Sequence, residues 1–198
     1  MSDVAALILA AGRGTRFGEE PKLLATLYGK PLVRWVAEAA LGSGVSPVIV
    51  VTGYRDADVE AQLADLPVRI ARNPAYADGM STSLKAGFCA LPSAAKAAVV
   101  LLGDMPLVDA AHIERLVAAW HEGGRPSALV PVTAHRRSNP VVLSRSLESG
   151  IMALHGDTGA AALLRDRRDV VEVLIDDPAL LQDVDTAEVL AALKRREV

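Results

Sequence analysis

The sequence predicts a three-layer α/β fold with a mostly parallel sheet, in a single domain that spans residues 1–198. Short apolar runs alternate along the chain with stretches whose apolar residues recur at helical spacing. The apolar runs are continuous, which is typical of parallel strands that helices cover on both faces. The 198 residues suit one large domain, and no linker, internal repeat or low-complexity tract divides them.

The expected elements follow this alternation in chain order. We expect strands at the apolar runs 5–9, 47–51, 68–71, 97–102, 129–132, 140–143 and 170–175. We expect helices at 32–41, 57–64, 81–91, 109–121, 159–165 and 186–193. Ser81 and Asp109 are suitable N-caps for their helices, and Asp185 with Glu188 is a candidate capping box for the last one.

Composition narrows the classes of function. The chain is 51% hydrophobic and 23% charged with a formal net charge of −3, which suits a globular protein that does not bind nucleic acid. No apolar run approaches the ~20 residues that span a bilayer, and the N-terminus lacks a basic, cleavable leader. We therefore expect a cytoplasmic protein without membrane contact. The single cysteine, Cys89, is an expected core residue, and the histidines lack the spacing of a zinc site.

The strongest chemical signal is the glycine-rich segment 9–18, which follows the first expected strand. Gly12 and Gly14 would let backbone N–H groups approach phosphate oxygens, and Arg16 and Lys22 would neutralise triphosphate charge. The segment is not a Walker A loop, because no Gly-Lys-Ser/Thr closes it, and its spacing differs from a Rossmann fingerprint. The alternative is a glycine-rich connection with incidental basic residues.

Two aspartates are candidate metal ligands. Asp104 follows the expected strand 97–102, where ligands of parallel sheets bind, and one or two carboxylates with phosphate oxygens and water suit Mg²⁺. Asp185, near the C-terminus, would supply the second carboxylate. The alternatives are a turn aspartate at Asp104 and a helix cap at Asp185.

Two clusters of polar residues are further candidates for substrate binding. Asn73 and the segment 78–83 place small polar residues at a helix start, where they would bind a base or a phosphate, with an ordinary turn and cap as the alternative. The segment 135–140, which contains Arg136 and Arg137, and the segment 155–159 suit an anionic second substrate. For the arginine pair, the alternative is a solvated loop.

Taken together, these segments resemble the MobA-like nucleotidyltransferases, and within them the molybdenum cofactor cytidylyltransferases. The resemblance rests on segments 9–16, 22–23, 103–106 and 183–186, in the order and spacing of the family, and it covers nearly the whole chain. Segments 79–84, 139–141 and 156–160 fit the cytidylyltransferase subgroup. The resemblance implies a Rossmann-like nucleotidyltransferase fold. It implies that CTP and a molybdopterin-type molybdenum cofactor yield a cytidine dinucleotide cofactor and pyrophosphate, for a molybdenum hydroxylase client.

The expected site then follows residue by residue. Arg16, Lys22 and Asp104 are the expected catalytic residues, and Asp104 and Asp185 are the expected ligands of Mg²⁺. The expected nucleotide-binding residues are Leu9, Ala10, Ala11, Gly12, Gly14, Asn73, Gly79, Ser81, Ser83 and Gly103. The expected second-substrate residues are Arg137, Asn139, Pro140 and Asp157.

One position favours CTP over another nucleoside triphosphate. The relatives that use CTP have Ala-Ala-Gly in the first loop, as at positions 10–12 here, and the guanylyl relatives have Ala-Gly-Gly. The chain departs from the subgroup at Ser138, where relatives often have glycine, and at Ala161, where they often have arginine. Both departures lie on the expected pterin side.

Two other functions remain open at this point. One is a nucleotidyltransferase that uses GTP, or that has a sugar phosphate or polyol phosphate as its acceptor. The other is a nucleotide-binding chaperone that delivers the cofactor to a hydroxylase without catalysis.

Overall fold

A computed structural model describes residues 3–18 and 20–195, so Met1, Ser2 and the last three residues of the expected domain lie outside the description. An eight-stranded sheet has the order β10-β7-β9-β6-β1-β4-β5, and β8 pairs with β7 off this path. Its strands are β1 (Val4–Ala10), β4 (Val48–Thr52), β5 (Arg69–Arg72), β6 (Ala97–Leu102), β7 (Ala128–Thr133), β8 (Arg136–Arg137), β9 (Val141–Ser144) and β10 (Val170–Leu174). A small antiparallel hairpin pairs β2 (Thr26–Leu27) with β3 (Lys30–Pro31).

The sheet is mostly parallel, as the continuous apolar runs predict. β1 lies at its centre and pairs in parallel with β4 and β6. β9 is antiparallel to both β6 and β7, a reversal that the apolar pattern did not predict. The carboxyl ends of β1 and β6 therefore lie side by side at one edge of the sheet.

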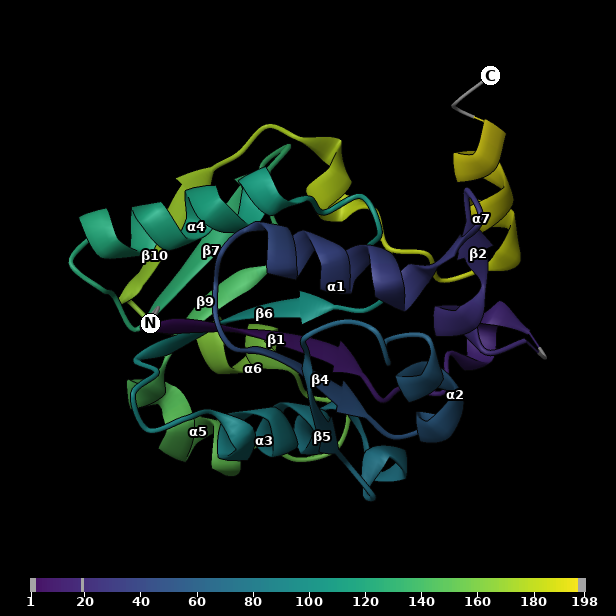
Figure 1. The fold of residues 1–198 in the computed structure, drawn as a ribbon. Coiled ribbons are helices and arrows are strands. Elements are labelled where there is room, and N and C mark those ends of the chain that lie inside the picture. The colour runs from purple at the N-terminus through teal and green to yellow at the C-terminus, as the bar shows by residue number, and fades with distance from the viewer. Residues whose placement is uncertain (1–2, 19, 196–198) are drawn as a thin grey trace.

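Helices cover both faces of the sheet, which confirms the three layers (Figure 1). α1 (Leu32–Gly42) and α4 (Ala110–Glu122) lie on one face, and α3 (Met80–Ala90), α5 (Glu148–Met152) and α6 (Ala160–Leu164) lie on the other. Successive β1 residues face opposite layers, because side chains alternate along a strand: Ile8 packs in the α1–α4 core and Leu7 in the α3–α5 core.

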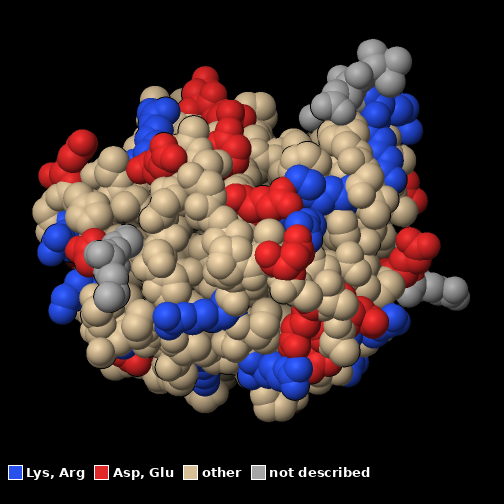
Figure 2. Space-filling model, in the orientation of Figure 1, with Lys and Arg blue, Asp and Glu red and all other residues tan. Residues whose placement is uncertain are grey.

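Two further helices lie beside these layers. α2 (Asp56–Ala61) follows β4, and α7 (Ala187–Lys194) packs its Leu190 and Leu193 with Leu27 of the hairpin in a third apolar cluster. No helix in residues 3–18 and 20–195 combines the length and apolar character that a membrane crossing requires. On the face that Figure 2 shows, acidic and basic side chains are interspersed.

Most helix and strand bounds agree with the expected ranges to within one or two residues, and α2 ends three residues earlier than expected. The Asp109 cap is confirmed, since its side chain accepts a hydrogen bond from the N–H of His112 at 2.9 Å. Two other predicted caps are wrong. Gly79 is the N-cap of α3, so Ser81 lies inside the helix, and Thr186 rather than Asp185 caps α7.

The predicted core position of Cys89 is also wrong, because Cys89 is exposed. Its neighbour Phe88 occupies the face of α3 that packs on the sheet, and the next residue of a helix is rotated by about 100° from that face.

Candidate active site

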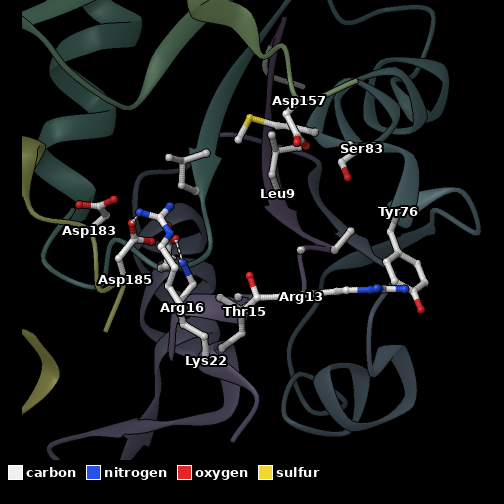
Figure 3. Close-up of a pocket in the computed structure, with 18 of the residues that line it drawn as sticks. Leu9, Arg13, Thr15, Arg16, Lys22, Tyr76, Ser83, Asp157, Asp183 and Asp185 are labelled. Atoms are coloured by element: carbon white, nitrogen blue, oxygen red, sulfur yellow. Dashed lines mark hydrogen bonds and ion pairs between the residues drawn. The ribbon is translucent and has the colours of Figure 1, made fainter. Parts of the chain in front are cut away.

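A cavity of about 660 Å³ opens at the carboxyl ends of β1 and β6. It is lined by the glycine-rich loop after β1, by the start of α3 and by the segment that precedes α7. In Figure 3, Arg16, Lys22 and Asp185 gather on one side of this cavity, and Arg13 extends toward Tyr76 on the other. These three segments and the segment after β6 that carries Asp104 therefore meet at one place.

Glycine is required at position 14 of the loop. Gly14 has a left-handed backbone with φ 59°, and a Cβ atom placed on it would lie 2.8 Å from the Cβ of Lys22. The following turn, η1 (Thr15–Phe17), inserts Phe17 into the cluster that packs α7 on the hairpin. The loop is thus held at Gly14, against the stem of Lys22, and at Phe17, in the apolar cluster.

Lys22 brings the two expected metal ligands together. Its Nζ lies 2.5 Å from Oδ2 of Asp104 and 2.9 Å from Oδ1 of Asp185, while Nη1 of Arg16 lies 2.8 Å from Oδ2 of Asp185. The Lys22 and Asp104 side chains are only 12% and 17% exposed, whereas that of Arg16 is 77% exposed. Both carboxylates therefore point at one position beside the glycine-rich loop.

The backbone explains why Asp185 reaches this position from the far end of the chain. The N–H of Val184 donates to the carbonyl oxygen of Asp104 at 2.9 Å, which joins the two acidic segments. Val184 is fully buried in the cluster formed by α7 and the hairpin. Because Asp185 follows this anchored residue, its side chain is held next to that of Asp104.

The carboxylates of Asp104 and Asp185 stabilise the positive charge of Lys22. Burial by itself disfavours the charged form of Lys22, but the two carboxylates outweigh it and raise the pKa of the ammonium above its usual value. Oδ1 of Asp104 is buried without a hydrogen-bond partner among the described residues, so it remains available to a cation.

This donor set fits a hard divalent cation such as Mg²⁺. Two carboxylates that converge on one position, one with a free buried oxygen, suit an ion that prefers oxygen ligands. Residues 3–18 and 20–195 contain no group of three or more His, Cys, Asp and Glu side chains that could hold a metal. A bound ion would therefore take its remaining ligands from phosphate oxygens and water.

The expected nucleotide-binding residues divide into two groups. Leu9, Ala11, Gly12, Gly14, Gly79 and Ser83 line the cavity, whereas Ala10, Asn73, Ser81 and Gly103 do not. Asn73 instead stabilises the start of α3 at the cavity wall, because its side-chain amide donates hydrogen bonds to the hydroxyls of Thr82 and Ser83 at 2.8 and 3.1 Å. The N–H of Gly103 donates to the carbonyl of Leu9 and so joins β6 to β1 behind the cavity.

Sequence reasoning missed the aromatic side of the cavity. Tyr76, in the turn η3 (Tyr76–Asp78), lies under the Arg13 guanidinium at 5.5 Å from the ring centroid. Gly53 permits this arrangement, since a Cβ there would lie 2.7 Å from the Cβ of Tyr76 and 2.9 Å from that of Ala11. Arg13 stands inside the glycine motif, but no periodicity or motif marks Tyr76.

A second cavity, of about 370 Å³, adjoins the first. The two share Leu9, Met80, Leu102 and Asp157 as lining residues. Of the expected second-substrate residues, Arg137, Asn139 and Asp157 line it, and Pro140 does not.

Most of the other walls of this second cavity are apolar. Arg137 is held in place by Glu172, whose Oε1 lies 2.7 Å from its Nε, and by the carbonyl of Leu164 at 3.2 Å.

Comparison with known proteins places the chain in a family. The model of the MobA-like NTP transferase domain matches residues 6–171. A protein named nicotine blue oxidoreductase, from Paenarthrobacter nicotinovorans, is 32% identical over 191 residues, which is 93% of each chain. The bifunctional protein GlmU of Syntrophotalea carbinolica is 37% identical over 149 residues, 75% of this chain but only 31% of GlmU.

A solved structure agrees with the fold. Rv0371c from Mycobacterium tuberculosis, determined in complex with manganese, superposes with a TM-score of 0.84 at 25% sequence identity, over 98% of this chain and 100% of that one. A nucleotidyl transferase from Methanothermobacter thermautotroptrophicus superposes with a TM-score of 0.80 at 25% sequence identity, over 97% of this chain and 96% of that one. The glycine-rich loop, the lysine and the paired aspartates therefore lie in a fold that a nucleotidyltransferase uses. The chain belongs to the MobA-like NTP transferase family, and it is a nucleotidyltransferase.

Proposed function

We propose that this nucleotidyltransferase transfers CMP from CTP to the terminal phosphate of a molybdopterin-type molybdenum cofactor and releases pyrophosphate. The product would serve a molybdenum hydroxylase client. The observation that carries the catalytic part is the convergence of Asp104 and Asp185 on Lys22, beside the glycine-rich loop. This arrangement supports the binding of one triphosphate by cations and backbone amides, beside two carboxylates.

Each group has a role in this reaction. A phosphate oxygen of the acceptor forms a bond to the α-phosphorus of CTP, the bond from that phosphorus to the leaving oxygen breaks, and pyrophosphate departs. The amides of Gly12 and Gly14 and the guanidinium of Arg16 hold the β- and γ-phosphates, and Lys22 stabilises charge at the α-phosphate. No general base is required, since a phosphate monoester is already ionised at neutral pH. Positioning and charge neutralisation therefore account for most of the catalysis.

Asp104 and Asp185 would hold Mg²⁺, which would neutralise negative charge on the phosphates when it is bound. The free buried oxygen of Asp104 supports this assignment. The manganese bound by Rv0371c supports a divalent ion at this fold, and Mg²⁺ is our choice among such ions.

The choice of CTP as the nucleotide and the choice of a molybdopterin-type acceptor are supported by separate observations. Ala11, the residue that distinguishes CTP-using from GTP-using relatives in the resemblance, lines the nucleotide cavity, and its methyl group lies close to Gly53. The adjoining second cavity supports a large acceptor with a flat ring system, whose faces would contact the apolar walls and whose edges carry polar groups. Arg137, Asn139 and Asp157 would bind those polar groups, and Leu9 and Leu102 would contact the ring system.

Pyrophosphate release tests the proposal directly. The purified protein is assayed with each of the four nucleoside triphosphates, with Mg²⁺, and with or without molybdenum cofactor. We expect release only with CTP and the cofactor together. Release with GTP, or with a sugar phosphate or polyol phosphate in place of the cofactor, would contradict the assigned substrates. Tight binding of CTP and cofactor with no pyrophosphate would instead indicate a delivery chaperone.

A further inference from the structure

We infer that Lys22 and Arg16 act as internal counter-ions of Asp104 and Asp185, so that the divalent ion and the nucleotide bind strongly only together. This inference rests on the proposed metal role of Asp104 and Asp185. An ion that binds both the carboxylates and the phosphates couples the two ligands by itself, and the counter-ions add a second coupling that acts on each ligand even when the other is absent.

The same atoms are needed for two different sets of contacts. In the structure, Lys22 bridges both carboxylates, and Arg16 binds the remaining oxygen of Asp185. In the proposed reaction, the carboxylates bind the metal ion while both cations bind phosphates. Two positive and two negative side chains therefore neutralise each other before any ligand arrives.

Either ligand alone would leave a charge without a partner. A divalent ion between the carboxylates would come close to the ammonium of Lys22, which is only 12% exposed and cannot be screened well by water. A nucleotide alone would draw Lys22 away from Asp104, whose carboxylate is 17% exposed and already has one oxygen without a partner. When both ligands bind, each side chain exchanges one partner of opposite charge for another.

The structure allows this exchange without rebuilding the backbone. The stem of Lys22 lies under Gly14, so its ammonium lies next to the loop that would receive the phosphates. Arg16 is 77% exposed and can turn from Asp185 toward the cavity at little cost. Figure 3 shows Arg16 and Lys22 side by side at the edge of the cavity, next to Asp185.

The first test measures Mn²⁺ binding to the nucleotide-free protein by electron paramagnetic resonance. We expect Lys22→Met to bind Mn²⁺ at least about tenfold more tightly than wild type, because the competing cation is gone. The double variant Lys22→Met/Asp104→Asn should lose this gain, which would locate the bound ion at the carboxylates. Equal affinity of Lys22→Met and wild type would overturn the inference.

The second test is reciprocal and contains no metal. Binding of CTP in EDTA is measured for Asp185→Asn and for Asp183→Asn. Asp183 lines the same cavity but forms no ion pair among the described residues, so its variant removes the same charge without releasing a cation. We expect Asp185→Asn to bind metal-free CTP at least about tenfold more tightly than Asp183→Asn. Equal affinities would overturn the inference.

Turnover separates this inference from the proposed function. If wild type releases pyrophosphate only with a divalent ion but both affinity comparisons show no change, the counter-ion exchange is wrong and the proposed function stands. If no divalent ion supports turnover and Mn²⁺ does not bind to Lys22→Met, the metal role of the two aspartates is wrong, and the inference is wrong with it.

Discussion

Gly79 and Gly156 are in such close contact that a Cβ placed on Gly79 would lie 2.2 Å from the carbonyl carbon of Gly156. The carbonyl oxygen of Gly156 also accepts a hydrogen bond from the N–H of Ser81 at 3.1 Å. The contact holds the loop that carries Asp157 against the start of α3, and Asp157 lines both cavities. A glycine pair thus fixes the wall between the nucleotide cavity and the second cavity.

Substitution at this contact should affect both substrates. We expect Gly79→Ala to raise KM for CTP and for the acceptor and to lower the free energy of unfolding by about 2–4 kcal/mol, because the loop must move and φ is positive. Steady-state kinetics and urea unfolding measure these effects. Gly44→Ala is the control: Gly44 also has a positive φ, but a Cβ there would meet nothing within 4 Å. If the two variants behave alike, the contact has no part in the site.

Removal of the Asp104 carboxylate should stop catalysis but not folding. We expect Asp104→Asn to lower kcat/KM by about 10²–10⁴-fold with Mg²⁺, since the isosteric amide cannot hold the ion as a carboxylate does. Far-UV circular dichroism should be unchanged, because Lys22 keeps Asp185 as a partner. Near-normal turnover of this variant with Mg²⁺ would show that the metal assignment is wrong.

The size of residue 11 should affect the choice of nucleotide. Ala11 lines the nucleotide cavity, and Ala11→Gly removes a methyl group that lies close to Gly53, which should make room at the cavity wall. We expect the ratio of kcat/KM for CTP to that for GTP to fall by about tenfold, a typical effect of one methyl group. An unchanged ratio would place base selection elsewhere.

Substitution of two adjacent arginines tests whether the second cavity binds the acceptor. Arg137 lines the second cavity, whereas Arg136, the other residue of β8, does not. We expect Arg137→Gln to raise KM for the acceptor by about 10–100-fold while KM for CTP changes little, because a charge-assisted contact to an anionic acceptor is lost. Arg136→Gln should leave both values near those of wild type. The acceptor assignment is contradicted if Arg136→Gln raises the acceptor KM as much as Arg137→Gln does.

Much of the fold could be predicted because its signals are local. The continuous apolar runs of β1 and β6 and the Asp109 cap of α4 depend only on residues a few positions apart. The antiparallel direction of β9 could not be predicted, since a short apolar run has no direction of its own. Tyr76 could not be assigned for a related reason, because its contact with Arg13 depends on a glycine, Gly53, in another loop.

The alternation of strands and helices, the glycine-rich loop, and a lysine and two aspartates suited to a metal and phosphate site can all be identified from the residues alone. The contacts of Lys22 with Asp104 and Asp185 depend on the folded chain, because these residues lie 82 and 163 positions away along the sequence. The fold also pairs Asp185 with Arg16 and Lys22, whereas Thr186 caps α7. The physical reason is that Asp185 is placed by the burial of Val184 against a distant hairpin, and no local pattern of residues encodes that packing.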